Sequence, residues 1–541
     1  MAASLKLVDA PTRAYDDRAE ARGVVAAPQR SLLRFITCGS VDDGKSTLLG
    51  RLLFETGAVF EDQLEALERD SARFGTTGAD VDFALLVDGL SAEREQGITI
   101  DVAYRYFATP RRAFIAADTP GHEQYTRNMA TGASTADVAI ILVDARKGIL
   151  PQTRRHSYIV SMLGVRRVIV AVNKIDLVGY SEDVFRGIER DYRALAQKLD
   201  FVETHIVPVS ARFGDNVVEA SDKTPWRTGP SLLALLESIE TAPAQDDVFR
   251  LPVQWVNRPN LDFRGFSGTI ASGSIGVGDR VVALPRGRTS RVARIVGPSG
   301  DIEEAGRGQS ITLVLADEID VSRGDVLVAA PTRIEPQRQI EARLLAMNEA
   351  PLAPGRNYLV KIGTNLTTAR IAALRHAIDV HDYSEQPAAN LPMNAIGVAT
   401  LRFETDLVAA TYRDCQALGG FILIDPYTND TVGLGVVQAD AAAPARRPAF
   451  GDRVVSLLSR ADLVRPESGA RDLARLVVNP LLTALVVLVV SGALLVAVAA
   501  GLADAVLRPA LGLFTDAVWK KIAERRDART TADLTVDGGS I

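Results

Sequence analysis

Residues 39–46 read GSVDDGKS, and this stretch decides the fold of the N-terminal part of the chain. It lies between an apolar run, LLRFITC at 32–38, and a segment with helical apolar spacing, TLLGRLLF at 47–54. The order of these segments predicts a strand, a tight loop and a helix. In a loop of the form GxxxxGK[ST], the glycines let backbone N–H groups and the helix N-terminus face phosphate oxygens. The predicted phosphate-binding residues are Gly39, Ser40, Val41, Asp42, Asp43, Gly44, Lys45, Ser46 and Thr47.

A second motif, DTPGH at 118–122, follows the apolar run AFIAAD at 113–118 and so delivers an acid at the end of a strand. Open α/β sheets bind ligands at that edge. We predict that Lys45 reaches the β- and γ-phosphates and that Ser46 offers its hydroxyl to Mg²⁺. Asp118 is predicted to hold the metal through water, and Gly121 to bend toward the γ-phosphate.

Further apolar runs repeat the alternation: VAIILVDA at 138–145, RVIVAVNK at 167–174 and HIVPVSA at 205–211. They are separated by stretches long enough for crossover helices. Runs that are apolar on both faces belong in a parallel sheet covered by helices on both sides. Residues 31–243 are therefore predicted to form a doubly wound α/β P-loop domain.

The run at 167–174 leads into NKID at 173–176, and HIVPV ends in Ser210 and Ala211. A carboxylate at Asp176 can accept hydrogen bonds from the N1 and N2 donors of guanine, a pair that adenine lacks. We predict that Asp176, Asn173 and Lys174 select the base and that Ser210 and Ala211 complete its pocket.

Beyond residue 242 the texture changes to short strands with Gly-rich turns, such as RLPVQWV at 250–256 and NYLVKIG at 357–363. This predicts one β-barrel at 247–331 and a second at 333–438.

The length of 541 residues suits several domains, and residues 1–30 are predicted to be a flexible leader. A net charge of −6 offers no general basic face, so no nucleic-acid partner is expected. Two distant cysteines predict neither a disulfide framework nor a zinc site.

Residues 439–541 are predicted to be a linker and a mostly helical tail. Residues 476–503 carry no charge, which predicts a transmembrane helix; a buried helix in an oligomer is the alternative. A following apolar stripe at helical spacing fits either a membrane interface or a partner surface, and it comprises Leu507, Leu511, Phe514, Val518 and Ile522.

The set GSVDDGKS, GITI, DTPGH, NKID and SA resembles the translational GTPases. That resemblance implies a Ras-like GTPase domain followed by two β-barrels, with GTP and Mg²⁺ as ligands. It also implies that Thr99 is the switch residue that meets the metal and the γ-phosphate, and that His122 positions the attacking water. Lys45, Thr99 and His122 are thus the predicted catalytic residues.

Long segments at 48–62, 122–137 and 419–435 are more similar to the large, GTPase subunit of bacterial sulfate adenylyltransferase (CysN type). The resemblance implies a nucleotidyltransferase complex in which GTP hydrolysis drives a small ATP-binding subunit to make adenosine 5′-phosphosulfate for sulfate assimilation. It implies a heterodimer or higher complex. From the scarcity of cysteines and the need for GTP we expect a cytoplasmic protein, which the apolar tail would attach to the inner face of the cell membrane. The alternatives are an elongation factor that delivers aminoacyl-tRNA and a non-catalytic membrane scaffold. The intact Lys45, Thr99 and His122 disfavour the scaffold.

Overall fold

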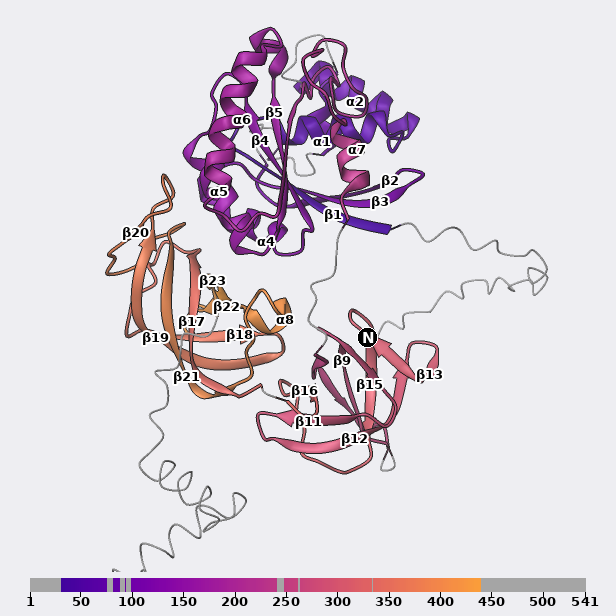
Figure 1. The fold of residues 1–541 in the computed structure, drawn as a ribbon, viewed down its shortest axis with the longest axis vertical. Helices are drawn as coiled ribbons and strands as arrows, with labels where there is room; N and C mark the ends of the chain where they lie inside the picture. The colour runs from indigo at the N-terminus through magenta and orange to yellow at the C-terminus, as the bar shows by residue number, and fades with distance from the viewer. Residues whose placement is uncertain are drawn as a thin grey trace, which may run out of the picture. The chain divides into compact units, whose positions relative to one another are not determined.

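The computed structural model describes residues 31–74, 81–87, 93, 99–240, 248–260, 263–332 and 334–438. These residues belong to one compact unit of the chain, Met1–Ala441. The described residues form an α/β part and two all-β parts (Figure 1).

The α/β part is built on a six-stranded sheet in the order β2-β3-β1-β4-β5-β6. Its strands are β1 (Ser31–Cys38), β2 (Ala103–Ala108), β3 (Arg112–Asp118), β4 (Val138–Asp144), β5 (Arg167–Asn173) and β6 (Glu203–Pro208). All neighbours pair in parallel except β2, which runs antiparallel to β3. The chain moves outward from β1 in both directions, and such a reversal opens a crevice at the carboxyl ends of the strands.

Helices cover both faces of this sheet, with α4, α5 and α6 on one side and α1 and α7 on the other (Figure 1). The helices are α1 (Lys45–Glu55), α2 (Glu61–Phe74), α4 (Thr126–Ala133), α5 (Pro151–Met162), α6 (Glu182–Ala196) and α7 (Leu232–Ser238), with short 3₁₀ turns η1 (Phe83–Leu86), η2 (Glu123–Tyr125) and η3 (Ile175–Val178). Every residue of β4 is buried because its side chains alternate between two cores: Ile140 and Leu142 pack toward α1, and Ile141 and Val143 pack toward α5.

The first all-β part has the strand order β7-β16-β11-β12-β15-β9-β8. Its strands are β7 (Arg250–Pro252), β8 (Trp255–Asn257), β9 (Gly265–Thr269), β10 (Ser274–Gly276), β11 (Arg280–Leu284), β12 (Arg288–Gly297), β13 (Gly300–Ile302), β14 (Glu304–Gly306), β15 (Ser310–Leu315) and β16 (Val326–Ala329). A bridge between Arg250 of β7 and Ser272, which follows β9, joins the first strand of this order to the segment after its next-to-last strand. The core inside includes Leu251, Phe266 and Leu313.

The second all-β part is a closed barrel, because β18 pairs with both β22 and β19. Its elements are β17 (Gln337–Ala346), β18 (Asn357–Ile362), β19 (Asn365–Ile378), β20 (Glu385–Gln386), β21 (Ile396–Leu407), α8 (Gln416–Gly419), β22 (Gly420–Ile424) and β23 (Thr431–Val437). Tyr358, Leu401 and Leu423 are among the side chains that fill its interior.

The fold prediction is confirmed for a P-loop α/β domain followed by β-barrel structure, and it is wrong for the transmembrane helix. No helix in the described part of the chain is long and apolar enough to cross a membrane. The 15-residue α6 is the longest helix whose bounds are given there, and at about 1.5 Å per residue it is shorter than a hydrocarbon core of about 30 Å. An uncharged run is only one condition for a span. Residues 476–503 themselves, the leader at 1–30, and the linker and apolar stripe within 439–541 lie outside the described residues.

Candidate functional site

The phosphate loop connects the end of β1 to the start of α1, as the motif predicted. Gly44 has φ +90°, and a Cβ at this position would lie 2.4 Å from the Asn173 side-chain nitrogen. Glycine is therefore required here both for the backbone angle and for the close approach of the base-side strand. Within the loop, the Asp43 carboxylate accepts a hydrogen bond from the backbone N–H of Ser40 at 2.6 Å.

Lys45 is buried against its own loop. Its Nζ donates to the carbonyl oxygen of Ser40 at 2.8 Å. Burial lowers the pKa of Lys45, and the neighbouring carboxylates of Asp118 and Asp43 oppose that shift. The ammonium group thus lies among backbone groups at the N-terminus of α1, where a phosphate would find both positive charge and N–H donors.

Three oxygen-bearing side chains meet beside this lysine. Ser46 Oγ donates to Asp118 Oδ2 at 2.6 Å and lies 3.2 Å from Thr99 Oγ1. The other oxygen of Asp118 accepts a hydrogen bond from Thr37 at 2.6 Å. Burial raises the pKa of Asp118, and the hydrogen bonds from Ser46 and Thr37 act against it. Hydroxyl and carboxylate oxygens are the ligands that Mg²⁺ takes in phosphate-binding sites, so this donor set fits that metal.

Gly121 and His122 both follow β3, but they have different surroundings. A Cβ on Gly121 would be 2.4 Å from Lys45 Nζ and 2.7 Å from the Ser40 carbonyl carbon, so this glycine packs directly on the phosphate loop. His122 is exposed and caps η2, where its Nδ1 accepts the N–H of Gln124 at 3.3 Å. In the described residues, its hydrogen bond is with its own turn rather than with the phosphate loop.

On the base side, Asn173 at the end of β5 joins two loops. Its Nδ2 donates to the Asp43 carbonyl oxygen at 2.7 Å, and its Oδ1 accepts the N–H of Ala211 at 3.0 Å. Ser210 Oγ donates to Asp176 Oδ1 at 2.6 Å, which orients the predicted guanine-binding carboxylate. The predicted phosphate-loop and base residues are therefore neighbours, although they come from positions more than a hundred residues apart.

The remaining predicted residues lie on the same loops. Lys174 donates through Nζ to the Asp42 carbonyl oxygen and forms an ion pair with Asp144 at 3.3 Å. Val41 and Asp42 form the turn of the phosphate loop, where Asp42 has φ +64°, and Thr47 lies half-buried in the first turn of α1.

Comparisons with known proteins identify the families that the α/β part and the second barrel resemble. The family model described as "Elongation factor Tu GTP binding domain" matches residues 30–243, and one described as "GTP-eEF1A C-terminal domain-like" matches residues 339–438. Sulfate adenylyltransferase subunit 1 of Chromobacterium violaceum is 56% identical over 420 residues, which cover 77% of this chain and 88% of that protein. The protein of the same name from Vibrio campbellii is 53% identical over 452 residues, 83% and 94% of the two chains.

The chain belongs to the sulfate adenylyltransferase subunit 1 family. Another relative, the bifunctional enzyme NodQ of Rhizobium sp. strain N33, is 54% identical over 415 residues, 76% of this chain and 64% of that protein. The predicted relationship to the GTPase subunit of sulfate adenylyltransferase is thus confirmed, and GTP binding follows from the elongation-factor-type domain. The elongation-factor alternative reflects the wider family of that domain.

Sequence reasoning missed two residues that support the loops of this family member. His156 of α5 is buried, and its Nδ1 accepts the N–H of Gly39 at 3.2 Å. Burial, reinforced by the charges of Lys45 and Arg155, lowers the pKa of His156 to about 3, so the ring is a neutral acceptor. No local motif marks a histidine in the middle of a helix as part of a phosphate loop.

Asp144, at the end of β4, is the second. Burial alone would raise its pKa, but hydrogen bonds from Arg146 and the charge of Lys174 outweigh burial and lower the pKa to about 2. Its Oδ2 lies 2.6 Å from the Arg146 guanidinium and 3.3 Å from Lys174 Nζ. The signal that could have found it is its position at a strand end, in register with Asn173.

Proposed function

We propose that this chain is the GTP-hydrolysing subunit of a sulfate adenylyltransferase and that the residues described above form its GTP·Mg²⁺ site. Asn173 carries this proposal, because its amide contacts both Asp43 of the phosphate loop and Ala211 of the base loop. One nucleotide could therefore contact both regions. The match of residues 30–243 to a GTP-binding domain supports the same reading.

On the base side, Asp176 would accept the N1–H and N2–H of guanine. The hydrogen bond from Ser210 restricts the rotation of the Asp176 carboxylate, so less conformational entropy is lost when the base binds. An adenine base offers no matching pair of donors and would leave the carboxylate poorly paired.

On the phosphate side, Ser46 and Thr99 would hold Mg²⁺ directly and Asp118 through water. The metal would neutralise charge on the β- and γ-phosphate oxygens. Lys45 adds a second positive charge at the same oxygens. His122, at the turn next to Gly121, would orient the attacking water in line with the phosphorus, and departure of the γ-phosphate would release Thr99 and Gly121.

We propose that the partner is a small ATP-binding subunit that forms adenosine 5′-phosphosulfate in the cytoplasm. In that reaction a sulfate oxygen bonds to the α-phosphorus of ATP as pyrophosphate leaves. Formation of this mixed anhydride is uphill, so a coupled GTP hydrolysis would drive it forward. Coupling requires that the GTP-bound and GDP-bound forms contact the partner differently.

The test is to combine the purified full-length chain with the small subunit and to measure pyrophosphate from ATP and sulfate beside phosphate from GTP. We expect pyrophosphate formation to exceed its GTP-free equilibrium yield only while GTP is hydrolysed. Replacement of GTP by a non-hydrolysable analogue should remove the excess. A yield that is identical with GTP and with the analogue would contradict the proposal.

A further inference from the structure

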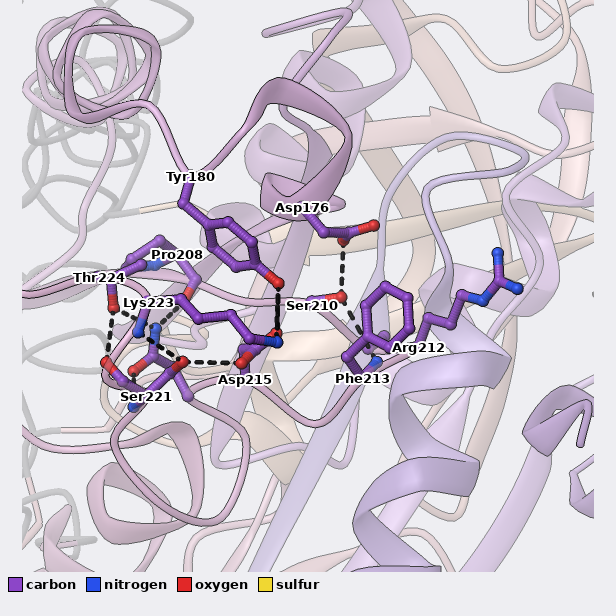
Figure 2. Close-up of polar contacts among 12 residues, drawn as sticks. Asp176, Tyr180, Pro208, Ser210, Arg212, Phe213, Asp215, Ser221, Lys223 and Thr224 are labelled. Atoms are coloured by element: carbon purple, nitrogen blue, oxygen red, sulfur yellow. Dashed lines mark hydrogen bonds and ion pairs between the residues drawn. The ribbon is translucent and has the colours of Figure 1, made fainter. Parts of the chain in front are cut away.

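A cluster of polar side chains lies beside the base loops and is absent from every motif noted in the sequence. Figure 2 shows Asp215 surrounded by Tyr180, Ser221 and Lys223, near Ser210 and Asp176. Asp215 is 9% exposed and lies in the loop that follows β6.

Both carboxylate oxygens of Asp215 are occupied. Oδ2 accepts the Tyr180 hydroxyl at 2.7 Å and Lys223 Nζ at 3.2 Å, while Oδ1 accepts the Ser221 hydroxyl at 2.7 Å. Burial would raise the pKa of Asp215, but these donors outweigh it and lower the pKa. Burial and the bond to Asp215 raise the pKa of Tyr180, so the phenol stays protonated and donates.

The backbone connects this cluster to the guanine loops. Ser210 and Asp215 form a β-bridge, in which the N–H of Ser210 donates to the Asp215 carbonyl oxygen at 3.1 Å. On the opposite loop, Tyr180 follows η3, and the N–H of Gly179 donates to the Asp176 carbonyl oxygen at 3.1 Å. Two side-chain links therefore span the same pair of loops: Ser210 to Asp176, and Asp215 to Tyr180.

The geometry of Tyr180 is consistent with a held position. It has φ +57°, an uncommon conformation for an aromatic residue. Trp226 Nε1 donates to the Tyr180 carbonyl oxygen at 3.0 Å, and Lys223 Nζ lies 5.3 Å from the centre of the Tyr180 ring. Contacts on the backbone, the ring and the hydroxyl thus fix the residue that follows the Asp176 turn.

We propose that Asp215 is a positioning residue of the guanine site, which acts through Tyr180 to set the distance between the Asp176 turn and the Ser210 loop. This inference rests on the proposed guanine site. Its consequence is that the hydroxyl of Tyr180 and the carboxylate of Asp215, which are not among the predicted base-contacting groups, influence discrimination between purine bases. Near β5 and β6 the two loops are also joined by Asn173 to Ala211 and by the Ile175 N–H to the Val209 carbonyl oxygen, so the Asp215–Tyr180 link acts at the far end of the Asp176 turn.

The experiment compares the full-length chain with its Tyr180→Phe and Asp215→Asn variants. Dissociation constants are measured for GDP and for IDP, which lacks the 2-amino group, and kcat is measured at saturating GTP. We expect GDP to bind about three- to tenfold more weakly in both variants, the range for one lost buried hydrogen bond. The ratio of the IDP to the GDP constant should fall, because a displaced Asp176 no longer rewards the 2-amino group, while kcat stays the same.

Tyr192→Phe is the matched control. Tyr192 lies in α6, is fully buried, and its hydroxyl is 3.1 Å from that of Ser157. Its loss should lower Tm without changing the IDP-to-GDP ratio. The inference is overturned if Tyr180→Phe behaves like Tyr192→Phe, with a lower Tm and an unchanged ratio. If the unmodified chain itself shows no preference for guanine over adenine nucleotides, the proposed guanine site fails before any variant is compared.

Discussion

On the phosphate side of the site, one contiguous loop supplies most groups, and several contacts involve its backbone. Lys45 donates to the carbonyl oxygen of Ser40, and Gly121 packs on that carbonyl group. On the base side, side chains from separate loops hold one another, as Ser210 holds Asp176 and Asp215 holds Tyr180. The phosphate side is thus centred on one contiguous loop, which Asp118 and Gly121 approach from another segment, whereas the base side has no such central loop and is assembled from separate segments. Changes to the first should impair chemistry, and changes to the second should impair affinity and base choice.

The largest effect should come from Lys45→Ala. We expect the rate of phosphate release from GTP to fall about 100- to 1,000-fold, because a positive charge at the transferred phosphoryl group is lost. Lys361→Ala, at an exposed lysine of β18, is the control and should leave the rate unchanged. Normal turnover in the Lys45→Ala variant would contradict the role of the phosphate loop in GTP hydrolysis.

His122→Ala should follow, with a fall in kcat of about 100-fold for a misplaced attacking water. Because the exposed His122 ring contacts its own turn, the dissociation constant for GTP should stay within about twofold. Single-turnover kinetics with separately measured binding give both values. Weaker binding at an unchanged rate would assign His122 to binding instead of catalysis.

Asp176→Asn should weaken GDP binding about tenfold to 100-fold, since it removes a charge-assisted pair of hydrogen bonds. Xanthosine diphosphate, which carries an oxygen in place of the 2-amino group, should bind this variant better than the unmodified chain. Asp191→Asn, on the exposed face of α6, is the matched control. An unchanged preference for GDP would place the base elsewhere.

The smallest effect concerns pH. The pKa of His156 is about 3 when folded, against an ordinary value of 6.5, so between these values the unfolded chain binds the additional proton. The stabilisation by neutral His156 is present above pH 6.5 and is lost as the pH falls. Denaturant titrations should show a loss of about 1 kcal/mol from this residue between pH 6.5 and 5.5, and a smaller loss in His156→Gln. Equal slopes in both proteins would contradict the neutral-acceptor role.

The sequence was sufficient for the α/β domain because its evidence is local. A buried strand such as β4 must be apolar on both faces, and a phosphate loop needs its glycines and lysine at set spacings. The apolar run at 476–503 was over-interpreted, because hydropathy shows only that a segment is apolar enough to enter a bilayer and not that it forms a spanning helix. His156 and Asp215 could not be found, since their partners Gly39 and Tyr180 lie far from them in the chain.

The sequence by itself determined the order of the elements, the chemistry of the phosphate loop, and the placing of Asp118 at the end of one strand and of Asp176 just after another, because these depend on residues adjacent in the chain. Only the tertiary structure decided that Asn173 bridges Asp43 and Ala211. It likewise decided the link between Asp215 and Tyr180. Such hydrogen bonds require donor and acceptor to be placed to within a few tenths of an ångström and at a suitable angle. The packing of the folded chain sets that placement, and the spacing of the residues in the sequence does not predict it.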